Sequence, residues 1–176
     1  MNLTLVRHAE VQEQYQNKYN GHNDISLSKN GKEQARILCQ ELNNLKFDAV
    51  FCSDLRRAKD TASELKHKII YTDKLREKSW GRHEGLSFNE IIKQNEIEYE
   101  NFLQWINALD GEDYQVYILG IKEFFFEYLP SLKKQNILII THAGVIRILQ
   151  TILHNKTLED VFSKKITYGE LIYENI

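Results

Sequence analysis

The sequence predicts an α/β fold in which a mostly parallel central sheet is flanked by helices as a three-layer sandwich. Short apolar segments alternate along the chain with amphipathic helical segments, which is typical of parallel strands joined by helical crossovers. Residues 136–141, NILIIT, form a continuous apolar run, as expected of a central strand buried on both faces. With 176 residues, 42% of them apolar, we expect a single domain over residues 1–176.

The first half of the chain is predicted to contain three strands and two helices. The apolar run NLTLV at residues 2–6 predicts the first strand. The helix expected over 27–42 begins near the capping candidate Ser28 and places its apolar residues at helical intervals. The remaining elements of this half are strand-like segments at 48–53 and 68–72, with a helical segment at 56–67 between them.

The second half is predicted to be mainly helical. One helix with a single break is expected over 88–109, and another over 114–134 with Pro130 near its end. The apolar strand described above is followed by a helix expected over 144–154. A final strand over 169–176 is expected at an edge of the sheet.

Charged and imidazole side chains follow three of the predicted strands. Arg7 and His8 follow the first strand, Arg56 and Arg57 follow the second, and His142 follows the apolar strand. Because ligands of parallel sheets bind at the carboxyl ends of the strands, we expect these side chains to share one rim. A guanidinium repels a divalent cation but fits a phosphate or carboxylate. The pattern therefore predicts an anion site without a metal or cofactor, in which an imidazole attacks a phosphoryl group.

Composition excludes several other classes of function. The net charge of −2 provides no basic field for nucleic acid. The longest apolar stretch, 136–153, contains His142 and Arg147, so we expect no membrane span. Two cysteines, no disulfide framework and no leader predict a cytoplasmic protein. We expect a small phosphorylated substrate as its partner, and a homodimer stays an open alternative.

Four motifs then resemble those of the histidine phosphatase superfamily, which includes the cofactor-dependent phosphoglycerate mutases. They occur in the family's order and extend over most of the chain. Ala9 and Ala143 stand where the family has glycine, and Gln14 stands near the usual Trp-Asn pair. The motifs are LVRHAE at 5–10, SDLRRAKDTA at 53–62, LREKSWGRHEG at 75–85 and THAG at 141–144.

The resemblance implies a role for each matching residue. His8 is expected to be the nucleophile, Glu77 the general acid and base, and Arg7, Arg57 and His142 the groups that hold the phosphoryl oxygens. An ion pair with a carboxylate is the alternative for each arginine, and Glu84 is the alternative carboxylate to Glu77. His22 and His83 are expected to border the pocket or to lie at the surface. The substrate-binding residues that the resemblance implies are Arg7, Gln14, Gly21, Arg57 and Ala143.

The resemblance also implies a phosphoglycerate mutase-like fold and a metal-independent phosphomonoester hydrolase that works through a phosphohistidine. Length and the third motif are most similar to small α-ribazole-phosphate phosphatases, so α-ribazole 5'-phosphate is one candidate substrate. Phosphoglycerate mutase is the first alternative. Hydrolysis is expected over mutase activity because mutases of the family have a longer middle and a tail that this sequence lacks. Protein phosphohistidine phosphatase and a non-catalytic phospholigand-binding module are the others. The segment 86–116 is expected to select the leaving group.

Overall fold

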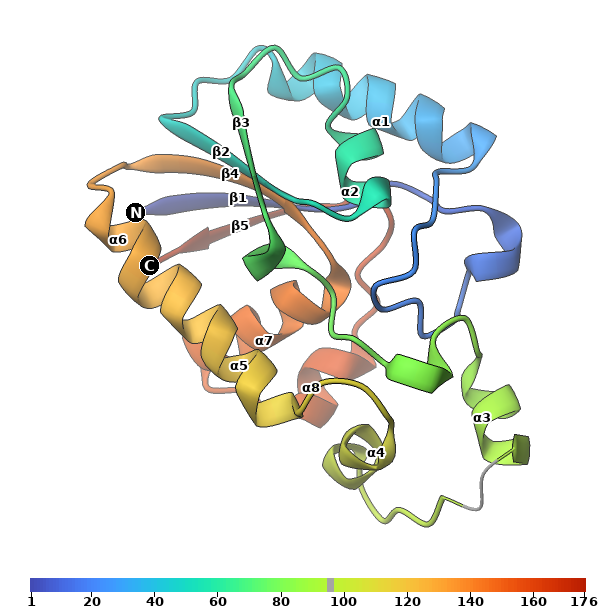
Figure 1. The fold of residues 1–176 in the computed structure, drawn as a ribbon. Helices are drawn as coiled ribbons and strands as arrows, with labels where there is room; N and C mark the ends of the chain where they lie inside the picture. Colours follow the sequence, from blue (N-terminus) through green and yellow to red (C-terminus); the bar gives the residue numbers. More distant parts are fainter. Residues whose placement is uncertain (95–96) are drawn as a thin grey trace.

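Five strands form one sheet in the order β3-β2-β4-β1-β5 (Figure 1). The structure is a computed structural model that describes residues 1–94 and 97–176. The first four strands run parallel, and β5 pairs antiparallel with β1 at the edge, as predicted. The strands are β1 (Asn2–Arg7), β2 (Ala49–Ser53), β3 (Ile69–Thr72), β4 (Asn136–Thr141) and β5 (Leu171–Asn175).

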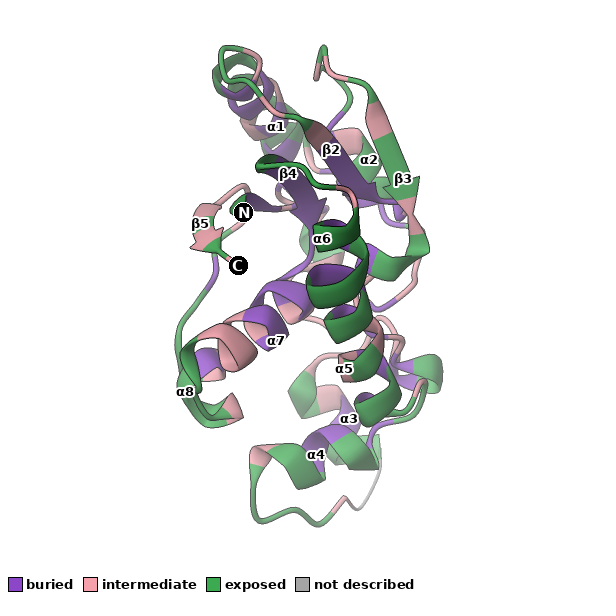
Figure 2. Cartoon of the chain, turned by 90° about the vertical axis from the view of Figure 1, so that its left-hand side faces the viewer, coloured by how far each residue is buried: buried purple, intermediate pink, exposed green. Residues whose placement is uncertain are grey.

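The core lies on both faces of the sheet, and the central strand β4 divides it. Ile137 and Ile139 belong to the larger cluster on one face, while Leu138 and Ile140 belong to a second cluster on the other. All four side chains are 0–1% exposed, because successive residues of a strand point to opposite faces. This burial explains the continuous apolar run, and it confirms the prediction of a central parallel strand (Figure 2).

Helices cover each face of the sheet and complete the three-layer α/β sandwich (Figure 1). α1 (Lys29–Leu42) and α2 (Arg56–Thr61) cover one face. The Ser28 hydroxyl caps α1 by accepting from the Gly31 N–H at 2.8 Å, as the sequence predicts. The second face and the end of the molecule beyond it carry α3 (Phe88–Gln94), α4 (Phe102–Ala108), α5 (Tyr114–Lys122), α6 (Leu129–Ser131), α7 (Ala143–His154) and α8 (Leu158–Ser163).

Helix α2 is shorter than predicted, since it ends at Thr61 rather than continuing to residue 67. The Asn43 side chain, just after α1, donates to the Glu64 carbonyl at 3.0 Å and accepts from the Lys66 N–H at 2.8 Å. These bonds hold residues 64–66 against α1 in a non-helical path. The helix therefore ends because of contacts with Asn43, which lies more than 20 residues earlier in the sequence.

The predicted helix over 114–134 is interrupted by a π-helical turn at Glu123–Tyr128. Within it the Leu129 N–H donates to the Phe124 carbonyl, five residues back. Pro130 has no N–H, and its ring clashes with the carbonyl four residues before it in a regular helix. The wider turn removes this conflict just before the proline. Helical structure ends at Ser131, three residues earlier than predicted.

The predicted helix over 88–109 is broken once, into α3 and α4, although residues 95 and 96 of this prediction lie outside the described residues. The Asn101 side chain caps α4 by accepting from the Gln104 N–H at 3.0 Å. Helix α8 was not predicted, although Thr157 and Asp160 form a capping box at its start. Within the described ranges, the structure contains no helix with the length and apolarity that crossing a membrane requires.

Candidate active site

The two histidines that follow β1 and β4 meet at the carboxyl end of the sheet. Arg7 pairs with Thr141 in the parallel register, and the His8 N–H donates to the Thr141 carbonyl at 2.9 Å. The His8 and His142 rings consequently lie 5.2 Å apart between centroids, although 134 residues separate them in sequence. The parallel pairing of β1 with β4 thus brings two of the predicted site residues together.

His8 is held in the form that a nucleophile requires. Its Nδ1 lies 2.8 Å from the Ala9 carbonyl, so Nδ1 carries the proton and donates it, and the lone pair is left on Nε2. Burial, followed by the charges of Arg57 and Arg7, lowers the pKa of His8 well below its usual range. The ring is 6% exposed and lines the cleft described below. A neutral imidazole with a free Nε2 therefore faces a solvent-accessible space.

Two guanidinium groups lie beside His8 and are fixed by backbone carbonyls. Arg57 donates to the carbonyls of Gly21 and Asn23 at 2.7 and 3.2 Å, and Arg7 donates to the Ile166 carbonyl. Neither forms an ion pair with a carboxylate in the described part of the chain, so the ion-pair alternative is not observed. Burial lowers the pKa of both groups, and arginine still remains charged under ordinary conditions. The site therefore offers two positive charges without a fixed counter-ion.

Glu77 enters the cleft from the loop after β3, where three donors surround its carboxyl group. The Gly144 N–H in the first turn of α7 donates to Oε2 at 3.1 Å, and the Lys78 N–H donates to Oε1 at 3.1 Å. Burial, followed by the charge of Glu77, raises the pKa of Tyr117 well above its usual range. Tyr117 therefore stays protonated, and its hydroxyl proton is shared between the Arg76 carbonyl at 3.1 Å and Glu77 Oε1 at 3.4 Å. Burial lowers the pKa of Arg7 and of Arg57, and the charge of Glu77 acts against it by raising both values. Glu77 therefore lies at the same site as the two arginines.

His142 is fully buried next to His8 and is oriented by Ser53. Its Nε2 lies 2.8 Å from the Ser53 hydroxyl, which already accepts from the Leu55 N–H at 3.3 Å. We assign the Ser53 proton to the bond with Nε2, which leaves the imidazole proton on Nδ1. Nδ1 is buried without a partner in the described part of the chain. Burial, followed by the charges of Arg57 and His8, lowers the pKa of His142 well below its usual range, so the ring is neutral.

A cleft of about 660 Å³ opens over this cluster, and Arg7, His8, Arg57, Glu77 and Ala143 line it. His142 does not line it. Of the other predicted substrate-binding residues, Gly21 is buried and contributes only the carbonyl that holds Arg57. Gln14 is exposed, donates to the Gln12 side chain at 3.1 Å and does not line the cleft. Gln14 and Gly21 thus lie outside the space where a substrate would bind.

Other charged and imidazole side chains of the second and third motifs bind the protein itself and stay outside the cleft. Glu84 accepts from the backbone N–H groups of His22 and Trp80 at 2.9 and 3.1 Å, and it does not line the cleft. Arg56 is exposed, pairs with Asp24 and Asp60 at 3.7 and 3.8 Å and does not line the cleft. His83 is buried and accepts from the Asp110 N–H at 2.9 Å, so it is not a surface histidine. The geometry thus favours Glu77 over Glu84.

The segment between α7 and β5 supplies functional side chains that the sequence analysis missed. The Tyr168 ring lies 4.0 Å from the Arg7 guanidinium carbon and 5.6 Å from the His8 ring. Lys165 and Ile166 also line the cleft. One available signal was position: an edge strand that pairs antiparallel with β1 starts beside the residues where β1 ends, which are Arg7 and His8. Arg147 lines the cleft as well, one turn after Gly144 on α7.

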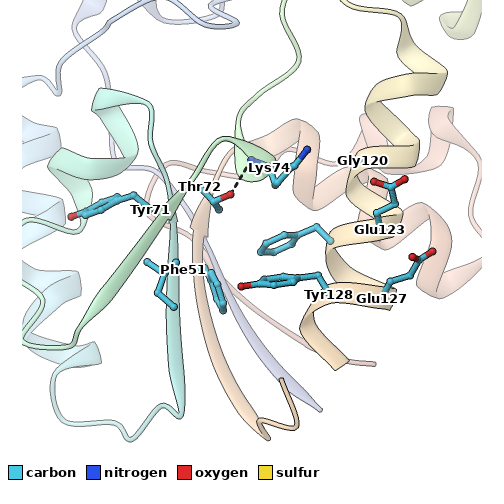
Figure 3. A pocket seen from close by; sticks show the side chains of 10 residues that line it. Phe51, Tyr71, Thr72, Lys74, Gly120, Glu123, Glu127 and Tyr128 are labelled. Carbon is cyan, nitrogen blue, oxygen red and sulfur yellow. Dashed lines mark hydrogen bonds between the residues drawn. The ribbon is translucent and has the colours of Figure 1, made fainter. Parts of the chain in front are cut away.

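A second cavity lies away from these residues, between β3 and the helix that contains α5 and its π-helical turn (Figure 3). It measures about 580 Å³ and has Phe51, Phe124 and Tyr128 among its lining, with Glu123 and Glu127 on the helical side. No histidine or arginine lines it. In the described ranges, no group of three or more His, Cys, Asp or Glu side chains has the arrangement of a metal site.

Cys52, directly before the second motif, is the other potential nucleophile of this region. Its thiol is 0% exposed, and burial raises its pKa. Cys39 is likewise free and buried. A cysteine-based phosphatase site also requires an arginine six residues after the cysteine, and that position is Ala58. The imidazole of His8 is therefore the available nucleophile of the cleft.

Comparison with known proteins agrees with this geometry. The sequence matches the family model of the histidine phosphatase superfamily (branch 1) over residues 3–173. The chain belongs to this superfamily. It is 30% identical over 158 residues to a probable phosphatase of Schizosaccharomyces pombe, covering 86% of this chain and 72% of the relative. It is 28% identical over 179 residues to the adenosylcobalamin/alpha-ribazole phosphatase of Escherichia coli, covering 96% and 87%.

The fold of this histidine phosphatase agrees with a solved relative. The crystal structure of the alpha-ribazole phosphatase from Shigella flexneri matches with a TM-score of 0.83 at 28% identity, covering 100% of this chain and 91% of that one. The predictions of a phosphoglycerate mutase-like α/β fold and of a phosphatase, a hydrolase of the phosphoglycerate mutase family, are confirmed.

Proposed function

We propose that this phosphatase hydrolyses phosphomonoesters of small metabolites through a phosphohistidine on His8, without a metal. The observation that carries the proposal is the state of His8. A neutral ring with its proton committed to the Ala9 carbonyl faces the cleft through a free Nε2, between two arginines that have no fixed counter-ion. The alternatives of a binding module or another reaction give no comparable reason for this arrangement.

In the first step, His8 Nε2 attacks phosphorus, and the bond between phosphorus and the leaving-group oxygen breaks. Glu77 gives its proton to that oxygen, so the leaving group departs as a neutral alcohol. Arg7 and Arg57, which line the cleft, balance the charge on the phosphoryl oxygens. The Ala9 carbonyl keeps its bond to Nδ1–H and stabilises the phosphorylated imidazolium.

In the second step, water attacks the phosphorus of phospho-His8. The Glu77 carboxylate, left by the first step, takes a proton from this water, and the bond between phosphorus and Nε2 breaks. Inorganic phosphate leaves, neutral His8 returns, and Glu77 is protonated again for the next cycle. The reaction needs no metal ion, because Arg7 and Arg57 supply the positive charge that phosphoryl transfer requires.

The substrate proposal begins with α-ribazole 5'-phosphate, since two relatives that cover most of this chain are named for α-ribazole. A screen of phosphorylated metabolites that includes it, scored by released phosphate, ranks the leaving groups. We expect kcat/KM for α-ribazole 5'-phosphate to stand well above that for 3-phosphoglycerate. Equal values for all compounds would remove the support for this substrate while leaving the reaction class intact.

Phosphatase and mutase activities are separated by a time course on 3-phosphoglycerate. We expect free phosphate to accumulate with little 2-phosphoglycerate, even with 2,3-bisphosphoglycerate present, because the cleft admits water to His8. Phosphorus NMR distinguishes the three products directly. Accumulation of 2-phosphoglycerate ahead of free phosphate would make the chain a mutase and overturn the proposed hydrolysis.

A further inference from the structure

A smaller lobe of about 260 Å³ continues the cleft away from Arg7 and Arg57. Three side chains line the lobe but not the cleft: Phe88, Phe102 and Ile106. A substrate whose phosphoryl group lies against His8 therefore extends its leaving group toward this lobe. The residues that line both spaces are Asn17, Lys18, Tyr19, Trp80, Arg147 and Phe162.

The lobe wall consists mainly of aromatic rings. The Phe102 and Phe162 rings lie 4.1 Å apart between centroids, and the Arg147 guanidinium carbon lies 4.5 Å from the Phe162 centroid. The Tyr19 and Trp80 rings form an edge-on pair at 5.1 Å. The Tyr19 hydroxyl accepts from Trp105 Nε1 at 2.8 Å and is thereby turned to the core. This wall therefore presents flat apolar faces to a ligand.

The charges of the lobe disfavour a cationic leaving group. Among the described residues, no aspartate or glutamate lines the lobe. Lys18 is paired with Glu90 at 3.4 Å, whereas Arg147 forms no ion pair with a carboxylate in the described part of the chain. An ammonium group placed here meets the charge of Arg147, for which the described part of the chain supplies no carboxylate partner. A guanidinium that already stacks on one ring is, in contrast, suited to stack on another.

We propose that this lobe is the leaving-group subsite and that it takes a planar, uncharged aromatic ring system. The inference rests on the proposed phosphomonoesterase reaction and names the class of its substrate. An apolar cavity of roughly 150 Å³ accommodates benzene, so the lobe has room for two fused rings. The rings of Phe102 and Phe162, with Arg147, hold the aromatic group while Arg7 and Arg57 hold the phosphoryl group.

Three alkyl phosphates test the subsite without changing the chemistry of the leaving oxygen: ethyl, 2-cyclohexylethyl and 2-phenylethyl phosphate. Each leaves as a primary alcohol, so differences report on the lobe and not on leaving-group acidity. We expect kcat/KM for 2-phenylethyl phosphate to exceed that of ethyl phosphate by at least about tenfold, from ring burial and stacking. It should also exceed that of the cyclohexyl ester, which is apolar but not planar.

Phe102→Leu should lower the ratio of kcat/KM for the phenyl ester over the ethyl ester, because Phe102 lines only the lobe. Phe126→Leu is the matched control: Phe126 is 37% exposed on the π-helical turn, lines neither space, and its replacement should leave the ratio as in the wild type. Hydrolysis of the ethyl ester with no preference for the phenyl ester, or equal preference for phenyl and cyclohexyl, would overturn the subsite alone. Failure to hydrolyse any ester, p-nitrophenyl phosphate included, would overturn the proposed reaction and this inference with it.

Discussion

Replacing Gly144 by alanine should displace the general acid without disturbing the fold. A Cβ at position 144 would lie 2.0 Å from Glu77 Oε1, whereas ordinary van der Waals contact begins at 3.4 Å. The carboxyl group must therefore move by about 1.4 Å, and it is the end of a flexible side chain, so it can do so. The movement also removes the bond from the Gly144 N–H to Oε2.

The expected cost of Gly144→Ala is at least about 10²-fold in kcat for alkyl phosphates, since a misplacement of about 1 Å costs this much. Complete loss of general acid catalysis sets the upper limit at about 10⁴-fold. The loss should be smaller with p-nitrophenyl phosphate, whose leaving group needs little protonation. Stability should be kept, because alanine is favoured over glycine within helices by up to about 1 kcal/mol and no positive φ is required at position 144.

Steady-state kinetics with ethyl and p-nitrophenyl phosphate, together with thermal unfolding, measure this prediction. Gly120→Ala is the matched control, because Gly120 also lies in a helix and a Cβ there meets nothing within 4 Å. Its kinetics should equal those of the wild type. The reasoning is refuted if folded Gly144→Ala keeps wild-type kcat with the ethyl ester, or if it loses the same factor with both esters.

Further outcomes follow from the site. Activity should survive exhaustive EDTA treatment and dialysis, and loss of activity that added Mg²⁺ or Zn²⁺ restores would show that a cation takes part. Glu77→Gln should lower kcat for alkyl esters by about 10²–10⁴ but less for p-nitrophenyl phosphate; equal losses would give Glu77 another role. Burial and the charge of Arg57 lower the pKa of His8 and His142, so the unfolded chain binds protons below about pH 6.5 that the folded chain does not. The free energy of unfolding should therefore fall by about 1.4 kcal/mol per pH unit for each histidine below that pH, and urea titrations in His8→Gln should show one histidine's share removed.

The sequence predicts the sheet and the meeting of the two histidines well, because both depend on local patterns. Apolar runs identify buried strands, and residues directly after parallel strands meet at one rim whatever the helices do. His8 and His142 are therefore located by position alone. Their proximity is predictable from the sequence, whereas the separation of 5.2 Å between their ring centroids comes from the parallel register of β1 and β4, which only the structure shows.

The remainder depends on contacts that a single segment does not reveal. The end of α2 is set by Asn43, which lies just after α1. The π-helical turn depends on how the chain adapts to Pro130. Gln14 matches a motif position, yet its turn directs it away from the cleft. The segment 86–116, expected to select the leaving group, does contribute Phe88, Phe102 and Ile106 to the lobe. Their partner Phe162 comes from a segment with no motif.

The central claim is that His8 carries the phosphoryl group during turnover. Rapid acid-free quenching of the enzyme with a ³²P-labelled phosphomonoester, followed by peptide mapping, tests it most directly. The account predicts an acid-labile, base-stable label on His8 that appears within one turnover and decays as phosphate is released. A His8→Ala protein that still folds should acquire no label and release no phosphate. A label elsewhere, or turnover that persists in His8→Ala, would contradict the account.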